Sequence, residues 1–157
     1  MRNFDITIPV VEATPDELTA EEKNLVELAR KSTYRSYAPY SKFHVGAAIL
    51  LSNGETVTGA NQENAAYPSG LCAERTAAYY AHANYPDATF KMIAIAARGT
   101  DGNPTEKPIS PCGACRQALL EYETLAKHNV PVILAGKDKV YIFRSVNSTL
   151  PYCFSEF

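Results

Sequence analysis

The pattern of apolar and polar positions near the start of the chain predicts one extended segment followed by one helix. Residues 4–10 alternate between apolar and polar side chains, which is typical of a strand. Pro9 lies within that run and favours an edge position or an extended arm, because proline has no backbone N–H for a sheet. A capping box at residues 19–22 precedes an apolar stripe with helical spacing. We therefore expect a helix over residues 20–35.

The next apolar segments predict a hairpin and a second helix. Residues 45–51 form a continuous apolar run, and residues 56–59 are β-prone. Asn53-Gly54 lies between these segments and is a strong signal for a tight turn between paired strands. Proline, serine and glycine then precede residues 71–83, for which the pattern predicts a helix.

The second half of the chain alternates between strand and helix patterns. Residues 91–97 form a strand of the buried type, and a polar loop rich in glycine and proline follows over residues 99–108. A third helix is expected over residues 113–128. Two further strands are expected over residues 130–135 and 140–143. The predicted order of elements is thus helix, strand, strand, helix, strand, helix, strand, strand.

The order of the elements predicts an α/β fold. Helical crossovers favour parallel neighbouring strands, whereas the hairpin adds an antiparallel pair. We expect a three-layer α/β/α sandwich with a five-stranded mixed sheet. Residues 1–157 should form a single domain, with residues 1–14 as an amino-terminal arm and residues 147–157 as a short terminal segment.

Composition and charge narrow the classes of function. The chain has 157 residues, enough to bury a core without disulfides, and a formal net charge of −2 from 15 Lys+Arg and 17 Asp+Glu. This balance provides neither a basic stripe for nucleic acid nor a polybasic patch for a membrane. The first residues lack the apolar core of a signal peptide, and no apolar run is long enough to span a bilayer. We expect a soluble, cytoplasmic protein.

Three of the four cysteines lie in motifs that suggest a metal site. Cys72 stands two residues before Glu74, and Cys112 and Cys115 form a Cys-x-x-Cys pair after Pro111. Two disulfides would be conceivable in a secreted chain, but clustered thiols in a reducing compartment more often bind a metal or take part in redox chemistry. Cys153 has no partner at ligand spacing, so we interpret it as a small buried apolar residue.

Both cysteine motifs fall at predicted helix starts, where free N–H groups and the helix dipole stabilise thiolates. Three thiolates suit Zn²⁺, and three protein ligands leave a position for water, as in catalytic rather than structural zinc sites. Glu74 would lie beside that open position, where a carboxylate can take a proton from water and pass it to a substrate.

Charge balance brings Arg75 into the site. Three thiolates on Zn²⁺ sum to −1, which should make a bound water less acidic than in a site with three histidines. Arg75 adjoins Glu74, and we expect it to donate hydrogen bonds to one or two of the ligand thiolates.

Each of these assignments has a simpler alternative. Cys112 and Cys115 by themselves could form a structural zinc knuckle or a redox pair. Glu74 could be a solvated charge on a helix surface. Arg75 could pair with a neighbouring acid. The three features point to one catalytic site only when they are taken together.

The sequence resembles the small homotetrameric zinc-dependent cytidine deaminases of the cytidine/deoxycytidylate deaminase superfamily, over about residues 25–154. Several linked motifs carry the resemblance. They are Pro39-Tyr40-Ser41-Lys42-Phe43, Val45-Gly46-Ala47-Ala48, Asn61-x-Glu63-Asn64-Ala65, Cys72-Ala73-Glu74-Arg75-Thr76-Ala77, Ser110-Pro111-Cys112-Gly113-Ala114-Cys115-Arg116-Gln117 and Leu150-Pro151-x-x-Phe154. The general zinc-deaminase signature has a histidine at the position of Cys72. A cysteine at this position corresponds to the all-cysteine variant that is typical of the small members of the family.

The resemblance implies hydrolytic deamination of cytidine and 2′-deoxycytidine to uridine and 2′-deoxyuridine plus ammonia, a step of pyrimidine salvage. It implies one Zn²⁺ per subunit on Cys72, Cys112 and Cys115, attack of zinc-bound hydroxide on C4, and Glu74 as the proton shuttle. The partners would be a pyrimidine nucleoside and other copies of the same chain.

The resemblance also implies how the nucleoside is held. Phe43 would stack on the pyrimidine ring, and Asn61 and Glu63 would hydrogen-bond the ribose 3′-hydroxyl. The backbone N–H of Ala73 would bind the ring O2, and the carbonyl of Ser110 would accept from the exocyclic amine. An amide paired with a carboxylate suits a sugar hydroxyl, because together they offer donors and acceptors.

By the family pattern, Ala65, Tyr67 and Phe154 would reach the pocket of a neighbouring subunit, so that the active site is complete only in the tetramer. Two positions depart from the pattern. His44 stands where proline is frequent, and Gln62 stands where an aliphatic residue is common. Neither change removes a catalytic group.

Three alternatives remain open. One is a deaminase of another cytosine-containing small molecule, such as the blasticidin type, although Asn61 and Glu63 favour a ribose. The second is a polynucleotide editor, which the absence of a basic groove disfavours. The third is a zinc-stabilised interaction module without turnover, from which Glu74 distinguishes an enzyme.

Overall fold

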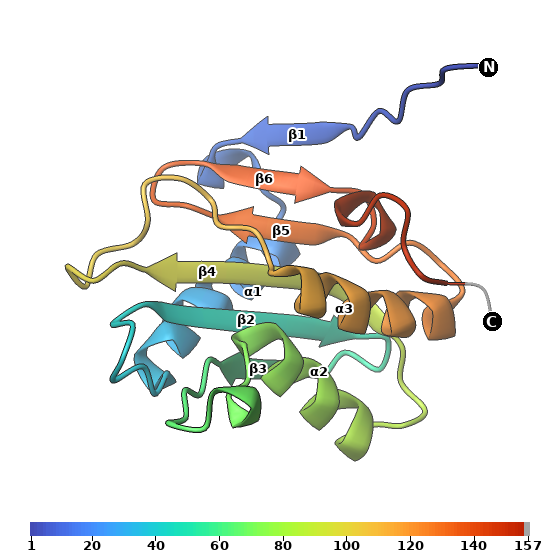
Figure 1. Ribbon diagram of the computed structural model, residues 1–157. Helices are drawn as coiled ribbons and strands as arrows, with labels where there is room; N and C mark the ends of the chain where they lie inside the picture. Colours follow the sequence, from blue (N-terminus) through green and yellow to red (C-terminus); the bar gives the residue numbers. More distant parts are fainter. Residues whose placement is uncertain (156–157) are drawn as a thin grey trace.

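A six-stranded mixed sheet forms the centre of the computed structural model, which describes residues 1–155 (Figure 1). Its strands are β1 (Val10–Ala13), β2 (His44–Leu51), β3 (Thr56–Ala60), β4 (Phe90–Arg98), β5 (Val132–Ala135) and β6 (Val140–Phe143). They lie in the order β1-β6-β5-β4-β2-β3. Only β4 and β5 are parallel neighbours, and the other adjacent pairs are antiparallel. The predicted mixed sheet is therefore confirmed.

Helices cover both faces of this sheet, as expected for a three-layer sandwich. Helix α1 (Ala20–Ser32) lies on one face, and α2 (Ala73–Asn84) and α3 (Gly113–Ala126) lie together on the other (Figure 1). The expected capping box is present at the start of α1. There the Thr19 N–H donates to the Glu22 carboxylate at 2.8 Å, and the Glu22 N–H donates to the Thr19 hydroxyl at 3.3 Å.

The sheet has six strands rather than the expected five. The strand expected over residues 4–10 lies instead at Val10–Ala13. The sixth strand is β1, which begins at Val10 and pairs antiparallel with β6 at the edge of the sheet. Residues 4–9 lie outside any strand and extend beyond the sheet. The reason is that β6 has only four residues, so its pairing with β1 ends at Val10 opposite Phe143. Pro9 also has no N–H with which to continue the pairing.

The strand connections explain how two distant cysteine motifs meet. Both β3 and β4 pair antiparallel with β2, so they run in the same direction on either side of it. Helix α2 follows β3 and helix α3 follows β4. Both helices consequently begin at the same edge of the sheet. The crossover through α3 joins parallel neighbours as expected, whereas β4 pairs with β2 rather than with β3.

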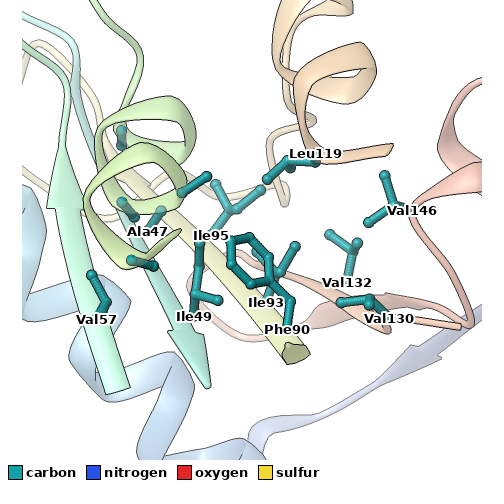
Figure 2. Packing of buried hydrophobic residues seen from close by; sticks show 14 of the residues in the cluster. Ala47, Ile49, Val57, Phe90, Ile93, Ile95, Leu119, Val130, Val132 and Val146 are labelled. Carbon is teal, nitrogen blue, oxygen red and sulfur yellow. The ribbon is translucent and has the colours of Figure 1, made fainter. Parts of the chain in front are cut away.

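The hydrophobic core between the sheet and helices α2 and α3 fixes the position of these helices on the sheet. Ile49, Ile93 and Ile95 project from the central strands and are fully buried (Figure 2). Phe90 stacks on Tyr122 of α3 with ring centroids 4.5 Å apart. Because a close-packed interior resists small displacements, this packing fixes the position from which α3 presents its first turn.

Two glycines let helices approach the strands closely. A Cβ atom at Gly46 would lie 2.1 Å from the carbonyl oxygen of Ala29 in α1, and one at Gly59 would lie 2.5 Å from the backbone nitrogen of Ala77 in α2. No side chain fits at either position. The backbone of α2 therefore rests directly on β3.

The expected terminal segment begins as a 3-10 turn, Asn147–Thr149, and continues without helix or strand to residue 155. Residues 156 and 157 of that segment lie outside the described part of the chain. Within residues 1–155, no helix is long and apolar enough to cross a membrane.

Candidate metal and catalytic site

Three cysteine sulfurs converge where α2 and α3 begin. Cys72 is the N-cap residue of α2, Cys112 is the N-cap residue of α3, and Cys115 lies in the first turn of α3. The Sγ atoms of Cys112 and Cys115 are 3.5 Å apart, and those of Cys72 and Cys112 are 3.8 Å apart. All three sulfurs lie within 4.8 Å of one another, so one ion can contact all of them.

The chemistry of this group fits zinc. Thiolates are soft ligands that Zn²⁺ accepts readily, and the free N–H groups of two helix N-termini stabilise negative charge on the sulfurs. Among the described residues the cluster contains three donors. Three protein ligands are typical of catalytic zinc sites, whereas structural sites usually close with four.

One arginine compensates the negative charge of the cluster. Arg75 donates from Nη2 to Cys72 Sγ at 3.8 Å. Hydrogen bonding with the Cys115 thiol lowers the pKa of Cys72 to about 5, and Arg75 acts in the same direction against the effect of burial. The Arg75 Nε atom is buried without a hydrogen-bond partner in the described residues, so this side chain has capacity for one more acceptor.

Glu74 is the carboxylate closest in sequence to this cluster. It lies in the first turn of α2 and is 3% exposed. Burial raises the pKa of Glu74 to about 7, and the negative charge of Cys72 adds to the effect. A carboxyl group whose pKa lies near neutrality can both accept and donate a proton, which is what a general acid–base catalyst requires.

A cavity of about 610 Å³ opens beside Cys72 and Arg75. Its wall combines polar side chains with two tyrosines. The lining residues are Tyr40, Ser41, Asn61, Gln62, Glu63, Asn64, Tyr67, Gly70, Leu71, Cys72 and Arg75. The volume lies in the range of small-molecule sites in proteins.

Asn61 and Glu63, the two expected sugar ligands, lie on the cavity wall and also organise the loop before β2. Asn61 accepts from the Val45 N–H at 2.8 Å and donates to the Phe43 carbonyl at 3.0 Å. The Glu63 carboxylate accepts from the backbone N–H groups of Tyr40 at 2.9 Å and Ser41 at 3.3 Å. Hydrogen bonding with the Ser41 side chain lowers the pKa of Glu63. Both residues therefore fix the backbone on either side of Phe43.

The other expected substrate residues occupy different surroundings. Phe43 is half-buried, and Ala73 is fully buried as the first residue of α2. Tyr67 is 80% exposed on the cavity rim, with its ring edge-on to Tyr40 at 6.4 Å.

Ser110 and Ala65 are exposed, and the Ser110 hydroxyl accepts from Arg116 Nη2 at 2.6 Å. Phe154 is 69% exposed and lies outside the cavity lining. The roles implied for these residues stay predictions.

Sequence reasoning missed Glu123, which is buried in α3. Its carboxylate accepts from the N–H groups of Val130 at 2.8 Å, Val146 at 2.7 Å and Asn147 at 3.0 Å. The signal was its spacing, because Glu123 falls on the same helical face as the buried Leu119 and Leu120. A glutamate among the apolar residues of a helix face is expected to be buried, and a buried carboxylate needs hydrogen-bond donors.

Comparison with known families decides what kind of protein this is. Residues 19–147 match the cytidine and deoxycytidylate deaminase zinc-binding region. The chain belongs to this family. The matched region contains all three cysteines of the cluster together with Glu74. The family membership and the sulfur geometry agree on a zinc-dependent deaminase.

Individual members of the family align over most of the chain. A cytidine deaminase of Sporosarcina psychrophila is 38% identical over 134 residues, which cover 85% of this chain and 91% of that protein. A probable cytidine deaminase of Dictyostelium discoideum is 35% identical over 136 residues, which cover 87% and 85%. The crystal structure of a cytidine deaminase from Burkholderia pseudomallei superposes with a TM-score of 0.72 at 37% identity, covering 87% of this chain and 100% of the other.

Proposed function

We propose that this chain hydrolyses cytidine and 2′-deoxycytidine to the corresponding uridine nucleosides and ammonia. The observation that carries the proposal is the buried carboxyl of Glu74 beside three convergent cysteine sulfurs at the start of α2 and α3. Zinc held by Cys72, Cys112 and Cys115 would activate water as a nucleophile. The similar cytidine deaminases support cytosine nucleosides as the substrate class.

Glu74 would perform the proton transfers. In the hydrolysis a C4–O bond forms and the C4–N bond breaks, while protons move from water to the ring N3 and to the leaving amine. A buried carboxyl with a pKa near 7 can take the first proton and deliver it at neutral pH. Arg75 would keep the thiolate charge partly neutralised through its hydrogen bond to Cys72.

The cavity wall supports a nucleoside rather than a free base or a polymer. Asn61 and Glu63 line the cavity together, and an amide with a carboxylate can receive a sugar hydroxyl. Their hydrogen bonds to the backbone around Phe43 would also hold that ring for stacking on the pyrimidine. The near-neutral net charge of −2 offers no general attraction for a phosphate backbone.

We further propose that the protein is a homotetramer whose active sites are shared. Large apolar side chains are exposed on α2 at Tyr79 and Tyr80, on the cavity wall at Tyr67 and on the carboxyl-terminal segment at Phe154. Exposed aromatic residues are enriched at protein interfaces. Native mass spectrometry should give four times the chain mass of 17.2 kDa. A monomer would contradict this proposal.

A cytoplasmic location fits the same chemistry. All four cysteines are free thiols, and a reducing compartment keeps thiols free for metal binding. Fractionation of cells that express the chain should recover it with cytosolic markers, and recovery with a secreted or periplasmic fraction would refute the assignment.

The deciding experiment follows cytidine by ultraviolet absorbance with the zinc-loaded protein and with a chelated sample. We expect conversion to uridine that stops on chelation and returns with added zinc. Glu74→Gln should lose about 10²–10⁴-fold in kcat. Glu121→Gln, at an exposed position of α3, is the matched control and should keep parental turnover. Absence of zinc-dependent turnover in the parent would refute the proposal.

A parallel assay separates substrate classes. Cytidine should be preferred over blasticidin in kcat/KM, because Asn61 and Glu63 present groups suited to a ribose. Equal kcat/KM for both compounds would show that Asn61 and Glu63 do not select a ribose, and would refute their proposed role.

A further inference from the structure

Three polar side chains of α3 hold the carboxyl-terminal part of the chain. Glu123 accepts from the N–H groups of Val146 and Asn147, and Arg116 donates from Nη1 to the Thr149 carbonyl at 3.0 Å. Gln117 donates from Nε2 to the Phe154 carbonyl at 2.8 Å. The segment is therefore fastened to one helix at successive points along its length.

Arg116 extends this connection to the metal site. Besides Thr149, its guanidinium donates to the Pro111 carbonyl at 2.9 Å and to the Ser110 hydroxyl at 2.6 Å. Ser110 and Pro111 immediately precede Cys112. The Arg116 side chain thus connects the residues that immediately precede Cys112 with the carboxyl-terminal segment.

We propose that Gln117, supported by Arg116, is a positioning residue that sets Phe154 relative to the metal centre. The inference rests on the proposed function and on the proposed tetramer with shared active sites, in which Phe154 would reach the nucleoside pocket of a neighbouring subunit. Gln117 lies two residues after Cys115 on the same helix. Its hydrogen bond to the Phe154 carbonyl therefore fixes the backbone at residue 154 relative to the helix that carries Cys115.

The local structure explains why such an anchor is needed. Residues 150–155 belong to no helix or strand, so no ladder of backbone hydrogen bonds defines the path of this segment. The side chain of Phe154 is 69% exposed. The hydrogen bond from Gln117 on helix α3 restricts the backbone of residue 154, from which the ring projects.

The test measures kcat/KM, bound zinc and melting temperature for Gln117→Ala. We expect about a tenfold loss in kcat/KM, which corresponds to about 1.4 kcal/mol and to the upper range of one hydrogen bond. The loss should appear mainly as a higher KM, because a pocket wall contributes to binding before and during the reaction. Bound zinc should stay at the parental level.

A double-mutant cycle distinguishes positioning from general support. Phe154→Ala should lower kcat/KM, and the variant with both substitutions should be no worse than Phe154→Ala by itself. Contacting or coupled residues show this loss of additivity, whereas independent ones add. Full additivity, or parental kcat/KM in Gln117→Ala, would overturn the inference.

Two further variants test whether a loss of kcat/KM in Gln117→Ala comes from the lost hydrogen bond rather than from lost side-chain volume or from the loss of any similar bond. Gln117→Met keeps the length of the side chain but removes the donor, and it should behave as Gln117→Ala does. Asn84→Ala removes a comparable amide-to-carbonyl bond, from Nδ2 to Tyr80 O at 2.9 Å on α2, and should leave kcat/KM unchanged. Parental activity in Gln117→Met would also refute the role of the hydrogen bond.

The outcomes separate this inference from the proposed function. If the parent protein does not deaminate cytidine, the proposed function fails before any variant is compared. If the parent is active but Gln117 and Phe154 act independently, deamination stands and only the positioning role is refuted.

Discussion

Replacing the buried Glu123 with alanine should strongly destabilise the protein. The carboxylate receives three backbone N–H groups, from Val130, Val146 and Asn147. The bonds from Val130 and Val146 are buried, and the bond from Asn147 is partly buried. These three bonds join α3 to the chain before β5 and to the chain after β6.

The magnitude follows from the groups left without a partner. A buried N–H that loses its acceptor costs about 1–3 kcal/mol, and bonds to a charged group are at the upper end of the range. Two fully buried donors, with a smaller share from the third, predict a loss of about 3–5 kcal/mol in the free energy of unfolding for Glu123→Ala. Glu123→Gln keeps one acceptor oxygen and turns its amide toward a donor, so we expect an intermediate loss of about 2 kcal/mol.

The assay is urea unfolding followed by circular dichroism at one chain concentration and with zinc present. Both conditions are held constant, because metal binding and association shift the apparent stability. Glu121→Ala, at an exposed position of the same helix, should change the unfolding free energy by less than about 0.5 kcal/mol. A loss below about 1 kcal/mol for Glu123→Ala would show that water replaces the carboxylate and would refute the reasoning.

Three further outcomes test other parts of the structure. Arg75→Ala should weaken zinc retention or turnover by about 10–100-fold, measured by competition with a chelator and by cytidine assay, and unchanged values would refute its charge-balancing role. Gly59→Ala should lower the melting temperature, because its Cβ would lie 2.5 Å from the Ala77 nitrogen, and a parental melting temperature would contradict that contact. Removal of zinc should lower the melting temperature reversibly, and an unchanged value in the chelated protein would argue against ligation by the native state.

Much of the fold could be predicted from local patterns. The capping box at Thr19, the hairpin around Gly54 and the order of helices and strands all depend on neighbouring residues, and the structure contains them. The strand at the amino terminus could not be placed in this way. Its position depends on where β6 ends, and residues 4–10 carry no information about a partner more than a hundred positions away.

The site shows the same division. Cys72 with Glu74, and Cys112 with Cys115, are short-range motifs, and both lie at helix starts as expected. Their residue types and spacing are sufficient to indicate an open zinc site. The resemblance to the cytidine deaminase family then indicated a pyrimidine nucleoside as the substrate. Local sequence and family pattern together therefore indicated the chemistry and the class of substrate.

Only the tertiary structure decided which residues support that chemistry. The shared direction of β3 and β4 brings two helix starts to one edge of the sheet, so that sulfurs forty positions apart lie 3.8 Å from each other. The contacts of Glu123 and Gln117 with the carboxyl-terminal segment likewise join positions distant in sequence. Local side-chain patterns identify groups able to react, but the approach of distant groups is set by strand pairing and core packing, which depend on the whole chain at once.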